Sequence, residues 1–402
     1  MDRPPHPPDG RATVVVAGAG IAGLEAALAL REFAGGRARV EVLDPRLRFR
    51  VPATATGRAF GIEAGIEAPV AGLVGRAGAV HRRGHLVGVD PRRRRAILSG
   101  GEPVRYDHLI VAVGARAEAF VPNALTFTGH REAPELKDMV EGVALSAARG
   151  EATDLVVAVP PACGWPVPAY EIAMLARDQL VASGHGDGVR VTVVTAEDRP
   201  LGVFGPAASD TVGRILARAG VRVRTGAVVR GWSRGGLELA GDEAVPADRV
   251  VALPVLRGPA IDGLPADRFG FLRTGSGGRV PGAPGVWVAG DATTFPVKQG
   301  GIACQQADAA ASAIARELGA DIDELPFEPV LRGWVWDGAG GRFLRTALAG
   351  GRGESAGLDD GSPLWWPVAK VAGRFLTPFL HDLPPGLPLT DLTPAPSPRA
   401  LA

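Results

Sequence analysis

A strand, a glycine-rich turn, a helix and a second strand that ends on an acid open the chain, and no other feature restricts the fold as much. The turn reads Gly18-Ala19-Gly20-Ile21-Ala22-Gly23, and the second strand is followed by Asp44-Pro45. Gly18 is expected to make the tight turn, Gly20 to let the backbone approach a pyrophosphate, and Gly23 to let the helix close on the strand. Asp44 lies about 20 residues further on, where a carboxylate accepts ribose hydroxyls. This unit therefore predicts an adenine dinucleotide at the helix N-terminus, contacted by the whole turn and by Asp44 and Pro45.

Two later segments indicate which dinucleotide this is. Residues 106–115 form an apolar strand that ends at Val113-Gly114, and residues 285–292 form another that ends at Gly290-Asp291. FAD is long, so a fold that holds it needs a second contact far from the first glycine turn. Asp291, at the carboxyl end of its strand, is expected to accept hydrogen bonds from the ribitol hydroxyls. We therefore predict FAD as the cofactor.

In order, the three segments resemble the motifs of the two-dinucleotide-fold flavoproteins, the pyridine nucleotide-disulfide oxidoreductase superfamily, over about residues 12–325. The middle motif, usually Ala-Thr-Gly, is Ala112-Val113-Gly114 here. The chain is most similar to the branch of type II NADH dehydrogenases, sulfide:quinone oxidoreductases and flavocytochrome c sulfide dehydrogenases. This resemblance implies an FAD-dependent oxidoreductase that passes two electrons from NAD(P)H or another small donor to a quinone or another acceptor.

Composition excludes several other classes of protein. The 402 residues are 46% hydrophobic and 22% charged, with a formal net charge of +1, which is typical of an ordinary globular protein and gives no reason to expect nucleic acid. No run approaches the roughly 18 to 20 apolar residues that span a bilayer, and residues 1–8 lack a signal core. Two cysteines without a C-x-x-C pair and seven scattered histidines predict no disulfide framework and no metal site. We expect a cytoplasmic protein.

Alternating strand and helix patterns predict an α/β fold with two Rossmann-like dinucleotide-binding domains, the second inserted in the first. The FAD-binding domain is expected to comprise residues 12–120 and 246–325, and the inserted domain residues 121–245. A small C-terminal region follows at 326–382. The lead-in, 1–11, and the Pro-rich tail, 383–402, are expected to be disordered.

In the superfamily, NAD(P)H binds where the first turn of the inserted domain repeats the glycine motif. Here residues 159–171 hold four prolines and one glycine, Gly164. Proline supplies no N–H group, and one glycine cannot fill the roles of three. NAD(P)H is therefore a donor that this turn supports weakly. Glu197, after the second strand of this domain, is a further candidate for a ribose contact.

Cys163 lies in the same turn and leads to an alternative function. Sulfide:quinone oxidoreductases and flavocytochrome c sulfide dehydrogenases carry a cysteine there beside the flavin, so the resemblance implies a catalytic Cys163 in a sulfide-oxidising flavoprotein. Their second cysteine has no counterpart here, because residues 330–341 contain Trp334 and Trp336 instead. Cys304 either pairs with Cys163 or, as we favour, the two are separate, partly buried thiols.

The segment Lys298-Gln299-Gly300-Gly301 opens the helix after the Gly-Asp motif. In the resembled family this helix directs its N-terminus at the pyrimidine edge of the flavin, and a helix N-terminus stabilises an anion by up to about 2 kcal/mol. Lys298, one of three lysines in the chain, is expected to add a mobile positive charge that favours reduced flavin. Residues 50–54 match the position of a proline-containing strand that passes along the flavin ring in relatives, so the resemblance implies that Arg50 contacts the cofactor.

Apolar residues at helical spacing predict an amphipathic helix over residues 364–380. We favour docking of this helix on the core of the protein or on the second copy in a homodimer. The alternative is a membrane interface, which would place the protein at the inner face of the plasma membrane. A third interpretation of the whole chain is a flavoprotein with little turnover that transfers electrons to, or binds, a protein partner.

Overall fold

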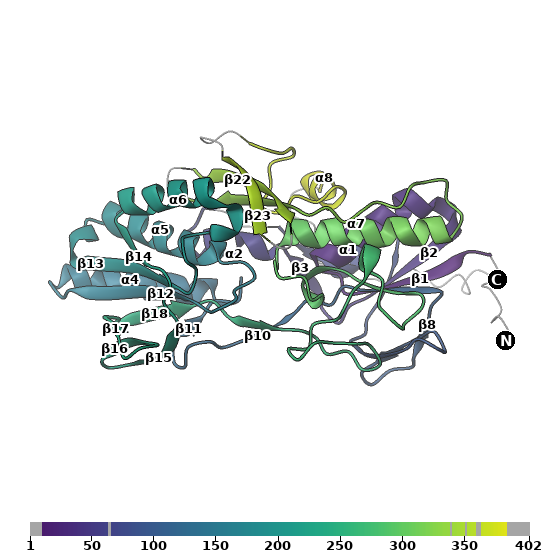
Figure 1. Cartoon of the computed structure of the whole chain (residues 1–402), viewed down its shortest axis with the longest axis horizontal. Helices are drawn as coiled ribbons and strands as arrows, with labels where there is room; N and C mark the ends of the chain where they lie inside the picture. Colours follow the sequence, from purple (N-terminus) through teal and green to yellow (C-terminus); the bar gives the residue numbers. More distant parts are fainter. Residues whose placement is uncertain (1–9, 63–65, 338–339, 350–351, 359–362, 384–402) are drawn as a thin grey trace.

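The computed structural model describes residues 10–62, 66–337, 340–349, 352–358 and 363–383. The lead-in and tail that we expect to be disordered lie almost wholly outside these residues. Within them, two five-stranded sheets form two α/β units that lie side by side (Figure 1). The prediction of an α/β fold with two Rossmann-like units is confirmed.

The first sheet is parallel and has the strand order β20-β9-β1-β2-β5. Its strands are β1 (Ala12–Ala17), β2 (Ala38–Leu43), β5 (Val80–Arg82), β9 (His108–Val111) and β20 (Val286–Val288). In β1, Val14 and Val16 pack toward the helices α1 (Ile21–Ala34) and α7 (Gly300–Glu317), whereas Val15 and Ala17 pack toward an antiparallel sheet, β6 (Leu86–Asp90), β7 (Arg95–Leu98) and β8 (Val104–Arg105). Both faces of β1 are thus buried, as a continuous apolar run predicts.

The second sheet has the strand order β11-β18-β12-β13-β14 and is also parallel. Its strands are β11 (Leu125–Thr126), β12 (Thr153–Val159), β13 (Val189–Thr195), β14 (Val221–Arg224) and β18 (Arg249–Ala252). The helices α4 (Ala133–Ala148), α5 (Val167–Ala182) and α6 (Pro206–Arg218) share a core with one face. The strands β15 (Val229–Ser233), β16 (Gly236–Leu239) and β17 (Ala244–Val245) pack on the other.

One predicted domain boundary needs correction. The boundary between 245 and 246 assigns β18 to the first unit, but β18 pairs with β11 and β12 inside the second sheet. The strand begins four residues after a short hairpin, so nothing local in the sequence indicates which sheet it joins. We propose a boundary after Ala252, where the chain returns through β19 (Val255–Arg257), which pairs antiparallel with β10 (Arg116–Glu118) to connect the two units.

The C-terminal region adds an antiparallel sheet of β21 (Val330–Val335), β22 (Arg342–Ala349) and β23 (Arg352–Leu358), followed by α8 (Leu376–His381). This sheet lies over the junction of the two units (Figure 1). Remaining short elements of the first unit are β3 (Arg48–Arg50), α2 (Ala55–Ala59), β4 (Glu67–Pro69) and α3 (Val70–Arg76).

The predicted helix over residues 364–380 is wrong, because only Leu376–His381 is helical. The backbone N–H groups of Phe375 and Leu376 donate to the buried carboxylate of Glu25 in α1. The N–H of Gly373 donates to the hydroxyl of Thr377. These three N–H groups therefore donate to side chains, whereas in an uninterrupted helix they would donate to backbone carbonyls. The apolar stripe packs on the core around α1 and α7, so docking on the protein itself, the favoured alternative, is what the structure contains.

Candidate functional site

The three predicted cofactor motifs meet at the carboxyl edge of the first sheet. The N–H of Ala112 donates to the carbonyl of Ala17 at 2.7 Å, and the N–H of Ala289 donates to the carbonyl of Val111 at 3.1 Å. These bonds continue the pairing of β9 with β1 and β20 past the strand ends. Segments as far apart in sequence as Ala17 and Ala289 therefore form one surface.

The glycines of the first turn have the distinct roles that the spacing predicts. Gly18 has φ of 107°, and a Cβ there would lie 2.3 Å from the carbonyl oxygen of Ala112. A Cβ on Gly23 would lie 1.7 Å from the carbonyl oxygen of Gly18, so only glycine lets α1 approach the strand. A Cβ on Gly20 would meet nothing nearer than the Arg46 guanidinium at 3.8 Å. The backbone at Gly20 is thus open to a ligand, as phosphate binding at a helix N-terminus requires.

Asp44 lies beside this turn but is held by a residue that the sequence reasoning missed. The N–H of Ala19 donates to Asp44 Oδ2 at 2.6 Å. Arg46 donates to both carboxylate oxygens, from Nε at 2.9 Å and from Nη2 at 2.6 Å. Burial acts to raise the pKa of Asp44, but these hydrogen bonds outweigh it and hold the pKa below its usual range. The Arg46 side chain is half-exposed, and the ribose contact of Asp44 stays a prediction that requires this side chain to move aside.

Asp291 is the carboxylate that the protein leaves available. Among the described residues, no donor hydrogen-bonds to its side chain, and burial raises its pKa. The preceding Gly290, at φ of 78°, is held by the amide of Gln306, whose Oε1 accepts the Gly290 N–H at 2.7 Å. A desolvated carboxylate without a donor fits a ligand that brings hydroxyl groups.

Lys298 is fixed rather than mobile, which corrects our expectation. Its Nζ donates to the carbonyls of Asp291 and Thr293 and lies 3.9 Å from the centre of the Phe271 ring. Burial lowers its pKa to about 8, although Asp291 opposes this shift. The charge therefore stands at a defined place, against the backbone carbonyl of Asp291.

The start of α7 combines the remaining predicted residues, and two of them contribute mainly to structure. Gln299 caps the helix by accepting the Ile302 N–H at 2.9 Å and donates to a carbonyl of β21 at 3.0 Å. Gly300 leaves room for Val371, since a Cβ would lie 2.9 Å from that side chain. The oxygen and one N–H group of the Gln299 amide are thus used within the protein, and the assignment of Gln299 to the cofactor stays a prediction.

Arg50 lies in an ion-pair cluster on the β3–β4 hairpin. It donates to Glu67 at 3.0 Å, and Arg48 and Arg58 share the same carboxylate. These contacts are local, and the structure leaves its assignment to the cofactor as a prediction.

The proline-rich turn after β12 brings Cys163 to the first unit. The N–H of Lys298 donates to the carbonyl of Gly164 at 3.0 Å, so the turn lies against the segment that follows the Gly-Asp motif. Cys163 and Cys304 are both free thiols, and they belong to different cores. Burial raises the pKa of Cys163 to about 12. At neutral pH this thiol is protonated.

The same turn holds prolines where a phosphate-binding loop has glycines. Trp165 follows Gly164 and packs edge-on against Phe204, with ring centres 5.8 Å apart. The second candidate for a ribose contact, Glu197, accepts the hydroxyl of Tyr170 at 2.6 Å and that of Thr195 at 3.0 Å. The acid is thus satisfied within the protein, and the turn offers prolines in place of N–H groups.

A buried ion pair that the sequence reasoning also missed connects three parts of the chain. Glu171 of α5 pairs with Lys370, and both side chains are at most 4% exposed. Glu171 also accepts the hydroxyl of Thr56 at 2.7 Å and the N–H of Trp336 at 3.0 Å. The ammonium group of Lys370 lies 3.5 Å from the centre of the Trp336 ring. In the sequence, the rarity of lysine was the one feature that could have drawn attention to Lys370.

FAD fits the first unit. The contacts that a long dinucleotide needs would come from the open Gly20, the carboxylate of Asp291, the positive-φ Gly114 with open space around it and the N-terminus of α7. In the described residues, no helix is long and apolar enough to cross a membrane, and no group of acids, histidines and cysteines is arranged to hold a metal. Fold and site together define a two-domain flavoprotein, an FAD-dependent oxidoreductase.

Comparison with known proteins identifies the family. The model of the pyridine nucleotide-disulphide oxidoreductase family matches residues 12–313, and the chain belongs to this family. It is 29% identical over 309 residues to an NADH dehydrogenase-like protein of Mycobacterium tuberculosis, covering 69% of this chain and 72% of that protein. Its fold is similar to that of the sulfide:quinone oxidoreductase of Aquifex aeolicus, with a TM-score of 0.77, 19% identity and coverage of 87% and 86%. The fold is also similar to that of a ferredoxin reductase of Rhodopseudomonas palustris, with a TM-score of 0.64 and 20% identity. This similarity covers 85% of this chain and 83% of that chain.

Proposed function

We propose that this protein oxidises a small donor other than NAD(P)H and passes the two electrons to a quinone or another acceptor. The observation that carries the proposal is the turn after β12, where Trp165 and prolines stand in place of a phosphate-binding glycine loop. Bound FAD supplies the two-electron redox chemistry. The chain itself supplies the glycine turn that accepts the phosphates, the carboxylate of Asp291, and the fixed charge of Lys298 beside it.

Anaerobic stopped-flow reduction of the FAD-loaded protein tests this proposal. NADH, NADPH and sulfide are mixed in turn with the protein, and the flavin absorbance band is followed. Both nicotinamides are expected to bleach the flavin far more slowly than the physiological donor does, because the turn lacks the N–H groups that bind a pyrophosphate. Rapid bleaching by either nicotinamide would overturn the proposal and support a type II NADH dehydrogenase activity instead.

Sulfide oxidation through Cys163 is the second candidate. It is favoured by the position of Cys163, whose neighbour Gly164 contacts the segment after the Gly-Asp motif, and by the fold similarity to a sulfide:quinone oxidoreductase. The raised pKa of the thiol counts against it, since the thiolate is the nucleophile. If this candidate holds, Cys163→Ser abolishes bleaching by sulfide and Cys304→Ser does not. Equal rates in Cys163→Ser and wild type would exclude a role for the thiol.

A protein as electron acceptor or donor is the third candidate. Rapid reduction of the flavin by a small donor would argue against this third candidate. If every small donor is slow and a co-purifying protein exchanges electrons rapidly with the flavin, this candidate replaces the first.

A further inference from the structure

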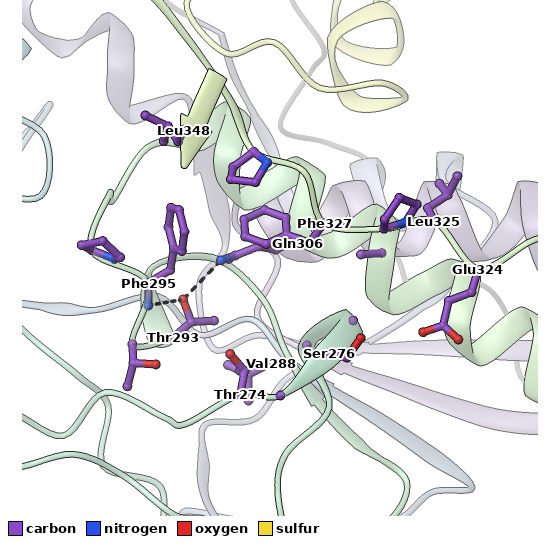
Figure 2. Close-up of a pocket in the computed structure, with 18 residues that line it drawn as sticks. Thr274, Ser276, Val288, Thr293, Phe295, Gln306, Glu324, Leu325, Phe327 and Leu348 are labelled. Atoms are coloured by element: carbon purple, nitrogen blue, oxygen red, sulfur yellow. Dashed lines mark hydrogen bonds between the residues drawn. The ribbon is translucent and has the colours of Figure 1, made fainter. Parts of the chain in front are cut away.

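A cavity of about 880 Å³ lies beside the Gly-Asp turn, and its lining contains none of the residues assigned above to the cofactor. Its walls come from the glycine loop 274–278, residues 293–296, α7, the linker 324–329 and Leu348 of β22 (Figure 2). This volume falls within the range of about 300–1,000 Å³ that small-molecule sites occupy. The cavity is therefore large enough for a metabolite.

The outer wall of this cavity is anchored along its length. At one end of the linker, Glu324 accepts a hydrogen bond from Arg279 at 2.5 Å. Next to it, the N–H of Leu325 donates to the Ser312 hydroxyl at 2.9 Å. At the other end, the carbonyl of Pro329 accepts the N–H of Leu348 at 2.9 Å. The cavity is thus bounded on this side by an anchored segment, as preformed ligand sites are.

The floor of the cavity offers one unused donor. Gln306 is 8% exposed, and its Oε1 is taken by the Gly290 N–H. Its Nε2 reaches the hydroxyl of Thr293 at 3.4 Å, and Figure 2 shows both side chains at the cavity. A primary amide has two N–H groups, and the second finds no partner among the described residues. A ligand with an acceptor oxygen would satisfy it.

The charge of the lining selects against anions. Of the residues that line the cavity, Glu324 alone is charged, and it is paired with Arg279. A phosphate or carboxylate inside would lose its water without gaining a cation. Nucleotides are therefore poor occupants.

The apolar walls favour a flat ring. Phe295 and Phe327 meet edge to face, with ring centres 5.2 Å apart. Val288, Leu325 and three prolines extend this surface. Aromatic side chains contact planar rings with favourable geometry beyond the area that they bury.

We propose that this cavity binds a neutral, planar aromatic molecule that carries a carbonyl oxygen, with its ring against Phe295 and Phe327 and its oxygen on Gln306. The site goes beyond the redox function proposed above. Gln306 also accepts the N–H of Gly290, the residue before Asp291. A molecule bound in the cavity therefore changes the surroundings of the flavin through this hydrogen bond.

Coumarin, a neutral bicyclic carbonyl compound, is a suitable probe, and coumarin-3-carboxylate is its charged counterpart. Equilibrium dialysis against the FAD-loaded protein measures both affinities, and the flavin difference spectrum reports on the contact through Gln306. Coumarin is expected to bind one to one and to shift the flavin spectrum, and the carboxylate is expected to bind at least tenfold more weakly. Absence of coumarin binding, or equal affinity for the carboxylate, would overturn the proposal.

Two variants locate the binding. Phe327→Leu removes one ring and is expected to weaken coumarin binding about two- to tenfold, whereas Leu348→Trp fills the cavity and is expected to abolish it. Phe269→Leu, at a 42% exposed phenylalanine outside the lining, is the matched control and should bind as wild type does. Where Leu348→Trp does not fold, Phe327→Leu decides, because wild-type affinity in that variant contradicts the assignment.

Discussion

Lys298 shows how a single residue acquires its properties from its surroundings. Two carbonyls and the Phe271 ring hold the ammonium group, and burial lowers its pKa to about 8. Its charge is therefore present below pH 8 and is lost as the pH rises through that value. The same charge lies beside Asp291, where the ribitol chain is expected.

Replacement of Lys298 by Met is expected to lower the midpoint potential of the bound flavin at pH 7. An interaction of about 1–2 kcal/mol corresponds to about 20–40 mV for a two-electron couple. The two proteins should converge above pH 9, where the wild-type lysine has also lost its proton. Titration against reference dyes measures both potentials. Identical potentials at pH 7 would show that the charge does not act on the flavin.

Residue types were easier to predict than residue partners. The glycine turn and Asp291 have the surroundings that their motifs imply, but Asp44 is paired with Arg46 only two positions away. Spacing identifies an acid at the end of a strand and contains no information on which donors reach it. The role of Gln306, a glutamine in an alanine-rich helix, was likewise not visible until α7 was placed against Gly290.

At the scale of elements, the contact between α1 and β1 is set by the glycines between them. Gly23→Ala is expected to destabilise the protein by at least about 3 kcal/mol, because its methyl group would lie 1.7 Å from the carbonyl of Gly18 and the helix would have to move. Gly20→Ala is the matched variant. It has room for the methyl group and should change the free energy of unfolding by about 1 kcal/mol or less, yet weaken FAD binding at least tenfold.

Urea unfolding of the apoproteins and fluorescence titration with FAD separate the two effects. Normal stability in Gly23→Ala would contradict the packing role, and normal FAD affinity in Gly20→Ala would contradict the phosphate contact.

Elements with strong local signals were predicted well, and those that depend on distant partners were not. The inserted βαβ unit has its strands and helices where the apolar periodicity indicates. Residues 364–380 also have a helical period, but most of the segment is not helical because Glu25, Glu171 and Thr377 bind its N–H groups and lysine. Periodicity predicts which side chains are buried, and the burial of Val371, Leu376 and Leu380 agrees with it.

Across the whole molecule, Glu171 and Lys370 connect the inserted unit to the C-terminal region, and Thr56 connects the first unit to the same carboxylate. Lys370→Met is expected to destabilise the protein by about 3–5 kcal/mol, because it leaves a buried carboxylate without its cation. Lys137→Met, at an exposed lysine 3.8 Å from Glu141, is the matched control and should change stability by less than about 1 kcal/mol.

Chemical unfolding followed by fluorescence measures both variants. The double variant Glu171→Gln, Lys370→Met should recover part of the loss, because the uncompensated charge is gone. Equal stability of Lys370→Met and Lys137→Met would show that the buried pair does not connect the three parts.

The sequence alone determined the class of the fold, the FAD motifs and the loss of the glycine loop in the second unit. These depend on local requirements, such as positive φ, the absence of a Cβ or a missing N–H, which a short stretch of chain reveals. Only the tertiary structure decided that Asp44 is paired while no donor in the described part of the chain reaches Asp291, that β18 joins the second sheet, that residues 364–375 are not helical and that a cavity lies beside the Gly-Asp turn. Apart from the Asp44–Arg46 pair, whose partners are two positions apart, these features depend on groups far apart in the chain, and packing, not local preference, determines which of them meet.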